Sequence, residues 1–348
     1  MSKVVTSHER PGVYSAYEAS AVVTAAGRRG WAAVAARSQQ GDPGTLYTLG
    51  TWREALETFG QEETLAGMIQ RLLANGAQRV LAVPVGEDND YAAAFALLGQ
   101  QENIKVVVCD SEDLSVQQSL RDQVAADAQN RRERIAVVPG GRDESVSQLV
   151  TRAQGLNSER VVLTAPGVSP EEGGALTAAA VAGAICGQAD PALPLGGQVL
   201  TGVSALAGRY TEEELDTLLQ GGVTPLEMAA GQCTVIRGVT TRTKTGDAPD
   251  DTWRELGTIL VVDDVIPAIR DALRARFPRA KNTAQSRGAI RTQVVLELEN
   301  KKSREIITDY DQVTVSAHPD DPTVCLVDFT FTVTHGLNQI WLTAHIVI

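Results

Sequence analysis

Few residues of this sequence have the type and spacing of a catalytic or metal-binding site. The four histidines and four cysteines are His8, His318, His335, His345, Cys109, Cys186, Cys233 and Cys325. The histidines lie near the chain ends and no cysteines form a C-x-x-C pair, so neither a metal site nor a disulfide framework is indicated. The motifs G-x-x-x-x-G-K-[ST], G-x-G-x-x-G, G-x-S-x-G and H-E-x-x-H do not occur either. We therefore expect no catalytic residue, metal or cofactor.

One turn has the composition of an anion site. Gly140 and Gly141 follow an expected strand, and Arg142 comes directly after them. Backbone amides at the start of a helix can bind an anion, and ligands of parallel sheets bind beyond the carboxyl ends of the strands. No base or nucleophile accompanies the turn, so an ordinary strand-to-helix connection is favoured. A two-domain α/β enzyme that binds an anionic ligand here remains the alternative function.

A basic cluster stands out because the net charge of the chain is −12. Its members are Arg270, Arg274, Arg276, Arg279 and Lys281. Basic residues late in a helix complement the helix dipole, which explains the cluster as a solvated face. An acidic partner surface explains it equally well. The overall negative charge argues against non-specific binding to nucleic acid.

Length and composition indicate a soluble protein with a large core and two domains. The chain has 348 residues, of which 43% are hydrophobic. No apolar run is long enough to cross a bilayer, and residues 1–11 lack the core of a signal peptide. We expect a cytoplasmic protein at synthesis that does not bind membranes.

The first two thirds of the chain predict a parallel α/β domain. Short apolar strands alternate with helical segments, as in sheets covered on both faces. Expected strands lie at 30–37, 45–49, 80–85, 104–109, 134–138 and 160–164, with helices at 91–101, 114–130 and 144–155. Capping boxes at Thr51–Glu54 and Thr211–Glu214 open two further helices. The small residues of 175–187 predict a helix that packs closely against another backbone.

The last hundred residues predict an α+β domain rich in antiparallel edges. A helix is expected from Asp264 to Phe277, with strands at 291–299, 304–308, 312–316 and 325–334. A final alternating run at 340–348 predicts a strand on which the sequence stops. An apolar edge strand must be paired, either within its own sheet or by a neighbour. Residues 13–17 follow a turn signal and predict an extended N-terminal arm.

Several short motifs are unspecific individually, but their order along the chain is specific. They are Thr51-Trp52-Arg53-Glu54-Ala55-Leu56, Asn75-Gly76-Ala77-Gln78-Arg79-Val80, Ala165-Pro166-Gly167, Gly238-Val239-Thr240-Thr241, Leu256-Gly257-Thr258-Ile259 and Lys281-Asn282-Thr283. In this order the chain resembles the tail sheath proteins of contractile bacteriophage tails and phage-tail-like particles. It departs from them at Asp263-Asp264, where relatives often carry a basic residue. Its short length suggests a compact sheath without outer decoration domains.

The resemblance implies a non-enzymatic subunit that stacks around an inner tube and contracts to drive that tube through a target envelope. Terminal arms would add strands to a neighbour's C-terminal sheet, through residues such as Val13, Tyr14, Tyr17, Ile340, Leu342 and Ile346. Arg270, Arg274, Arg279 and Lys281 would contact the tube. The implied partners are further copies of the chain, the tube protein, and the baseplate and tail terminator proteins. Assembly would take place in the host cytoplasm, before incorporation into a virion or tail-like particle.

The expected organisation has five parts. They are an N-terminal arm (1–20), an N-terminal β/α region (21–86), a central α/β core (87–252), a C-terminal α+β domain (253–336) and a C-terminal arm strand (337–348). The polar loop 242–252 marks the main boundary. A strand-exchanging structural protein unrelated to contraction is a third interpretation of the same patterns.

Overall fold

The larger part of the chain is built on one eight-stranded sheet. The computed structural model describes residues 30–61, 63–169 and 173–338. The strand order is β2-β3-β1-β4-β5-β6-β7-β8, and the neighbours from β3 to β7 are parallel. The strands are β1 (Trp31–Arg37), β2 (Tyr47–Leu49), β3 (Arg79–Val85), β4 (Ile104–Cys109), β5 (Ile135–Pro139), β6 (Val161–Ala165), β7 (Val223–Ala229) and β8 (Gln232–Val235). Only the edge strands β2 and β8 are antiparallel, so the predicted parallel domain is confirmed.

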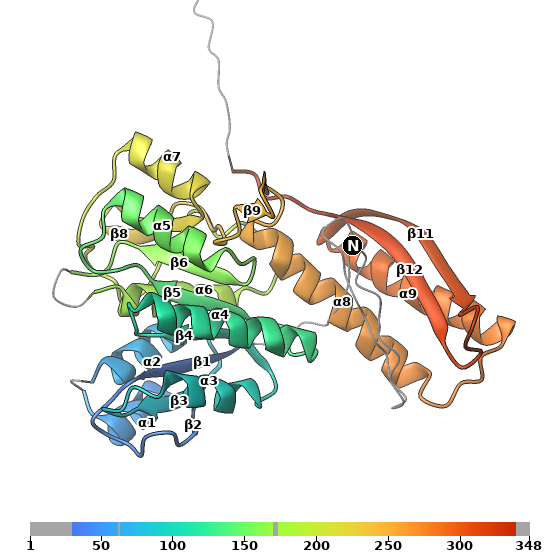
Figure 1. Ribbon diagram of the computed structural model, residues 1–348, viewed down its shortest axis with the longest axis horizontal. Helices are drawn as coiled ribbons and strands as arrows, with labels where there is room; N and C mark the ends of the chain where they lie inside the picture. Colours follow the sequence, from blue (N-terminus) through green and yellow to red (C-terminus); the bar gives the residue numbers. More distant parts are fainter. Residues whose placement is uncertain (1–29, 62, 170–172, 339–348) are drawn as a thin grey trace, which may run out of the picture.

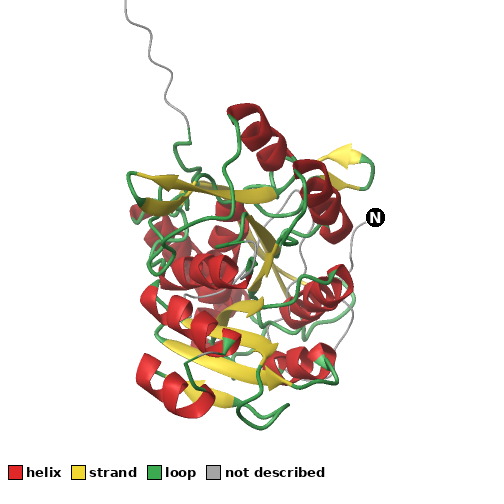
Figure 2. Cartoon of the chain, turned by 90° about the vertical axis from the view of Figure 1, so that its left-hand side faces the viewer, coloured by secondary structure: helices red, strands yellow, loops and turns green. Residues whose placement is uncertain are grey.

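Helices cover both faces of this sheet, which explains the continuous apolar strands (Figures 1 and 2). One face packs against α1 (Trp52–Phe59), α2 (Thr64–Ala74), α6 (Ala175–Gly187) and the first half of α8 (Leu256–Arg276). The other packs against α3 (Tyr91–Gly99), α4 (Leu114–Gln129), α5 (Val146–Leu156) and α7 (Glu212–Gln220). Strand β1 lies between β3 and β4, so strands on either side of residue 86 share one sheet.

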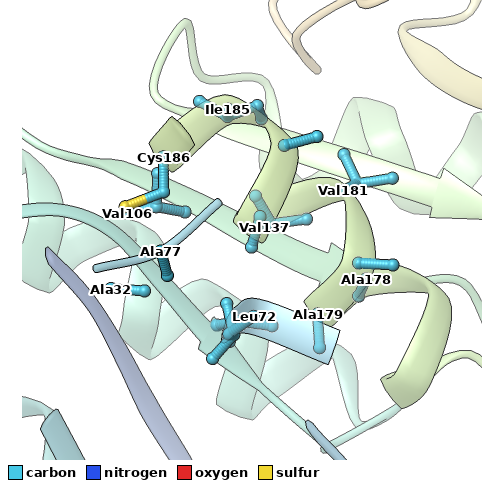
Figure 3. Packing of buried hydrophobic residues seen from close by; sticks show 14 of the residues in the cluster. Ala32, Leu72, Ala77, Val106, Val137, Ala178, Ala179, Val181, Ile185 and Cys186 are labelled. Atoms are coloured by element: carbon cyan, nitrogen blue, oxygen red, sulfur yellow. The ribbon is translucent and has the colours of Figure 1, made fainter. Parts of the chain in front are cut away.

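The small residues of α6 bring its backbone close to α2, as the sequence predicted. Figure 3 shows α6 lying over the sheet beside Leu72 of α2. A Cβ atom built on Gly183 would lie 2.7 Å from the carbonyl oxygen of Leu72. One built on Gly76 would lie 2.8 Å from the Cα of Gly187. The two segments therefore approach more closely than side chains at these positions would permit.

Replacing Gly183 by alanine is therefore expected to lower the free energy of unfolding by about 1 to 3 kcal/mol, because the added methyl group overpacks the contact with α2. The matched control is Gly288→Ala in α9, where nothing lies within 4 Å of the added Cβ. That change should raise the free energy of unfolding by about 0.5 to 1 kcal/mol, since alanine is the better helix residue. Urea unfolding of the two variants measures the difference, and equal midpoints would contradict the close approach.

A smaller α+β module continues from the sheet domain along α8 (Figure 1). Its elements are the second half of α8, α9 (Ala284–Ser303), β11 (Ile307–Ala317) and β12 (Cys325–Val333). Both helices lie on one face of the antiparallel β11–β12 hairpin around a separate apolar cluster that includes Val265, Val294 and Phe329. A short hairpin of β9 (Lys244–Thr245) and β10 (Ala248–Pro249) lies in the connecting region.

Three sequence-based predictions for this module need correction. Helix α8 begins at Leu256, well before Asp264, and contains Pro267. Residues 291–299 form part of α9, because Val294 and Leu298 recur at helical spacing and both are buried. The two short strands expected at 304–308 and 312–316 are one strand, β11, with an irregular register between Asp311 and Thr314. The predicted strand at 325–334 is confirmed as β12.

Candidate functional site at helix α8 and the C-terminal hairpin

The Gly140–Arg142 turn is filled by carboxylates of the chain itself. The amide of Gly141 donates to Glu144 at 2.9 Å, and the amide of Arg142 donates to Glu112 at 3.0 Å. Glu144 also pairs with Arg152 at 2.6 Å. Burial raises the pKa of Glu144, but the bonds from Arg152 and Gly141 outweigh it and leave the pKa below its ordinary value. An external anion would have to displace these carboxylates, so the geometry does not support the anion-binding enzyme.

The other candidate groups for chemistry are dispersed or buried. In the described ranges, no three His, Cys, Asp or Glu side chains lie together as metal ligands. Burial raises the pKa of Cys186 to about 12 and that of Cys233 to about 11, which disfavours their reactive thiolates. Among the helices placed by the structure, none combines the length and hydrophobicity needed to cross a membrane.

Helix α8 is fastened to the sheet domain by buried ion pairs. The guanidinium of Arg160, at the start of β6, donates to both carboxylate oxygens of Asp263 at 2.7 and 2.9 Å. About two turns later, Arg270 pairs with Glu133, which precedes β5. All four side chains are at most 13% exposed. These pairs fix one side of α8 at the amino ends of two neighbouring strands.

Another ion pair joins α8 to α9: Asp264 of α8 pairs with the buried Lys301 of α9. The acidic pair Asp263-Asp264 therefore reaches in two directions, toward the sheet and toward the module. Sequence reasoning did not identify Arg160, Glu133 or Lys301 as important. A usable signal was present, because Glu133 and Arg160 are charged residues beside buried strands, and the amino ends of adjacent parallel strands lie close together.

Arg270 does not belong to the exposed basic surface that the sequence suggested. Its side chain is 4% exposed and faces Glu133. Helical spacing placed it one turn from Arg274, but the sheet domain covers that side of α8. Arg274, Arg279 and Lys281 are exposed, and none of them forms an ion pair within the residues that the structure places.

Further basic residues, the half-buried Arg287 and the exposed Arg291, follow in α9 at the end of the module that is far from the sheet (Figure 1). We call this region the basic tip and define it as Arg274, Arg276, Arg279, Lys281, Arg287 and Arg291. No aspartate or glutamate occurs between Asp271 and Glu297. The tip is thus a continuous positive segment in an acidic chain.

The β11–β12 hairpin is incompletely covered. On its inward face Phe329 is 4% exposed, whereas Val327, Phe331 and Val333 are only half-buried. Each strand pairs with the other alone, so in the described part of the chain both outer edges lack a partner strand. Unpaired edges beside an apolar face are suited to receiving further strands. The predicted arm residues Val13, Tyr14, Tyr17, Ile340, Leu342 and Ile346, and also His8 and His345, lie outside the described residues.

Comparison with known families decides the relationship. The family model for the phage tail sheath protein central domain matches residues 86–241, and the model for the phage tail sheath C-terminal domain matches residues 248–347. The chain belongs to the phage tail sheath family. The second match includes α8, α9 and the hairpin, so the module described above is a sheath C-terminal domain.

Individual sheath proteins are similar over part of their length. The tail sheath protein of Bacillus phage SP01 is 28% identical over 261 residues, which are 71% of this chain and 44% of that protein. The tail sheath protein of Mycobacterium phage Bxz1 is 28% identical over 59% of this chain and 38% of its own length. The chain thus spans less than half the length of these two relatives.

Solved structures share the complete fold. The helical sheath of the anti-feeding prophage in its contracted state matches with a TM-score of 0.72 and 17% identity, covering 98% of this chain and 99% of that one. A chain of the six-fold symmetrised anti-feeding prophage baseplate structure matches with a TM-score of 0.75 and 19% identity, covering 99% and 100%. The sheath tail protein of Desulfitobacterium hafniense matches at 0.70 and 14%, covering 92% and 100%.

Proposed function

We propose that the protein is a non-enzymatic subunit of a contractile tail sheath, which polymerises around an inner tube and contracts to drive that tube through a target envelope. The observation that carries the proposal is the half-covered, open-edged hairpin in a chain of the phage tail sheath family. Such a hairpin is an acceptor for strands, and the terminal segments have the alternating pattern of donors. The subunit assembles in the host cytoplasm and then forms part of a virion or tail-like particle.

The proposed link between subunits is strand addition to the β11–β12 hairpin. A donated strand that buries roughly 500 Å² of apolar surface gains about 12 kcal/mol. Ordering about ten residues costs on the order of 15 kcal/mol. A single arm is therefore marginal, and two arms per subunit together with the high local concentration inside a ring stabilise the polymer. Contacts of this head-to-tail kind do not close on themselves, so they generate an extended assembly.

Electron microscopy of the purified chain tests the proposal directly. Hollow tubes with the diameter of a contracted sheath are expected from the chain alone. Longer, narrower sheaths are expected when the cognate inner tube and baseplate are present, and a tail terminator should limit their length. Monodisperse particles at all salt and protein concentrations, with and without the tube, would contradict a sheath function.

The basic tip is proposed as the inner-tube contact. The variant Arg274→Glu with Arg279→Glu and Lys281→Glu should lose extended-sheath assembly on the tube while unfolding at the same temperature as the unmodified protein. Exposed ion pairs contribute only about 0 to 1 kcal/mol each, so the contact is weak and can release cooperatively. Added salt should weaken tube binding of the unmodified protein in the same way.

A control with the same change in net charge is available. Arg53, Arg209 and Lys244 are exposed basic residues outside the tip, and their replacement by glutamate leaves the tip unchanged. Sedimentation with preformed tubes compares the two triple variants. Equal binding by both would show that the tip is not the tube contact and that only overall charge matters.

A further inference from the structure

A cavity of about 250 Å³ lies at the first turn of α8 and contains no residue of the basic tip. Most of its walls come from the loop Ala192–Leu195, the first turn of α8, and the linker 334–338 that follows β12. Gln188, after α6, and Arg237 and Gly238, after β8, complete the lining. The linker and the loop touch closely, because a Cβ on Gly336 would lie 2.7 Å from the Cβ of Pro194. The cavity therefore lies where the C-terminal linker meets the sheet domain.

Four residues that line this cavity carry buried polar atoms without a hydrogen-bond partner. Thr258 is 5% exposed, and its hydroxyl has no hydrogen-bond partner. Oε1 of Gln188, Nε of Arg237 and the hydroxyl of Thr334 also have no hydrogen-bond partner. All four residues line the cavity. Buried polar groups are normally hydrogen-bonded, so these four atoms are free to bond to a group that enters the cavity.

The chemistry of the walls selects a neutral partner that both donates and accepts hydrogen bonds. The charge of Arg237 is already balanced by Glu255, which pairs with it beside the cavity. Oε1 of Gln188 requires a donor, whereas Nε of Arg237 requires an acceptor. Peptide groups, carboxamides and hydroxyls supply both. Leu195, Leu256 and Leu260 add apolar surface to the walls.

The size of the cavity and its rim favour a peptide over a small-molecule cofactor. The volume is below the roughly 300 to 1,000 Å³ of typical ligand pockets and suits one or two amino-acid residues. Leu193, which lines the cavity, is 57% exposed. A bound chain would cover this exposed apolar side chain.

The position of the linker identifies the source of that peptide, and this step rests on the proposed function. Asn338 lines the cavity, and the terminal strand that is proposed to enter a neighbouring subunit begins just beyond it. The neighbour that accepts the strand must therefore lie beside the cavity.

We propose that the cavity at the start of α8 receives an uncharged, hydrogen-bonding peptide segment from the second copy of this chain that accepts its terminal strand. Thr258, Gln188, Arg237 and Thr334 bond to that segment, and Leu193 packs against it. Strand donation and cavity filling are then two halves of one contact.

Gly257 allows the cavity to be filled without disturbing the fold. It lines the cavity, and nothing lies within 4 Å of a Cβ built on it. The variant Gly257→Leu should raise the critical concentration for polymerisation about tenfold, because the inserted side chain displaces one or two hydrogen bonds. Gly257→Ala is the control and should polymerise like the unmodified protein, and both variants should unfold at or above its midpoint.

A photo-crosslinking amino acid at position 193 tests the occupant in the full-length chain. Polymers grown from mixed isotope-labelled and unlabelled subunits should give crosslinked peptides between copies, and monomers should give none. Polymers whose crosslinks from position 193 are confined to one copy, or unimpaired polymerisation of Gly257→Leu, would overturn the inference and leave the sheath proposal intact. Failure of the unmodified chain to polymerise would overturn both.

Discussion

Replacement of Arg160 by methionine is expected to lower the free energy of unfolding by about 3 to 5 kcal/mol at neutral pH, because it leaves a buried carboxylate without its partner. Asp263 accepts two hydrogen bonds from Arg160 and lies in the fields of Glu133 and Glu159. The variant removes the favourable interactions and retains the repulsive ones. Denaturant unfolding monitored by circular dichroism measures the loss.

The pH dependence of the same variant has a definite sign. Burial raises the pKa of Asp263 above its ordinary value even though Arg160 lowers it, so loss of Arg160 raises that pKa further. A carboxyl group with a raised folded-state pKa favours folding most below its unfolded-state pKa, and this contribution is lost as the pH rises through the folded value. The loss of unfolding free energy caused by Arg160→Met should therefore be smallest in acid and grow toward neutral pH.

Two controls separate an unpaired charge from general disruption. Arg160→Met combined with Asp263→Leu removes both charges and should recover most of the lost stability, since apolar pairs can replace buried ion pairs. Arg53→Ala breaks the exposed pair with Glu57, whose side chains are 87% and 64% exposed, and should change stability by less than about 1 kcal/mol. A double variant as unstable as Arg160→Met would contradict the ion-pair explanation.

Removal of residues 339–348 is expected to convert the polymer into monomers while leaving the described fold intact. The deleted segment carries the alternating residues Ile340, Leu342 and Ile346, and the deletion retains α8, α9 and the hairpin. Each subunit would keep its acceptor edges and lose a donor strand. Because one arm is marginal by itself, the remaining arm should not sustain a polymer. Negative-stain microscopy and analytical ultracentrifugation measure the outcome.

A point variant provides a more conservative version of the truncation. Ile340→Asp with Leu342→Asp keeps the chain length but makes the apolar face of the expected strand polar. It should lose assembly as the truncation does. A control with Thr343→Ser, on the opposite face, should assemble normally. Tubes formed by the truncated chain would show that the C-terminal segment does not link subunits.

The orientation of the C-terminal module depends on contacts that no local pattern specifies. Ion pairs from Asp263, Asp264 and Arg270 hold α8 between the sheet and α9. Each pair joins residues more than thirty positions apart in the sequence. Their partners become recognisable only once the strand order is known.

The sequence by itself was sufficient to predict those helices and strands that are marked by neighbouring residues, such as apolar runs and helix caps. Buried parallel strands appeared as short continuous apolar runs, and capping residues placed helix starts. At Thr211, for example, the side chain accepts from the amide of Glu214 while Glu214 accepts from the amide of Thr211. The small residues of α6 likewise predicted close backbone packing. These features depend on neighbouring residues or on residue size, so they can be read without knowing the fold.

Only the tertiary structure decided those features for which the local sequence fits two structures equally well. Residues 294–298 alternate as a strand would, yet Val294 and Leu298 also recur at helical spacing, and packing against α8 and β11 selects the helix. Arg270 and Arg274 both occur late in α8, but only Arg270 faces the sheet domain and pairs with Glu133. Burial and charge pairing depend on what lies opposite a residue in space, and that information is not contained in a local stretch of sequence.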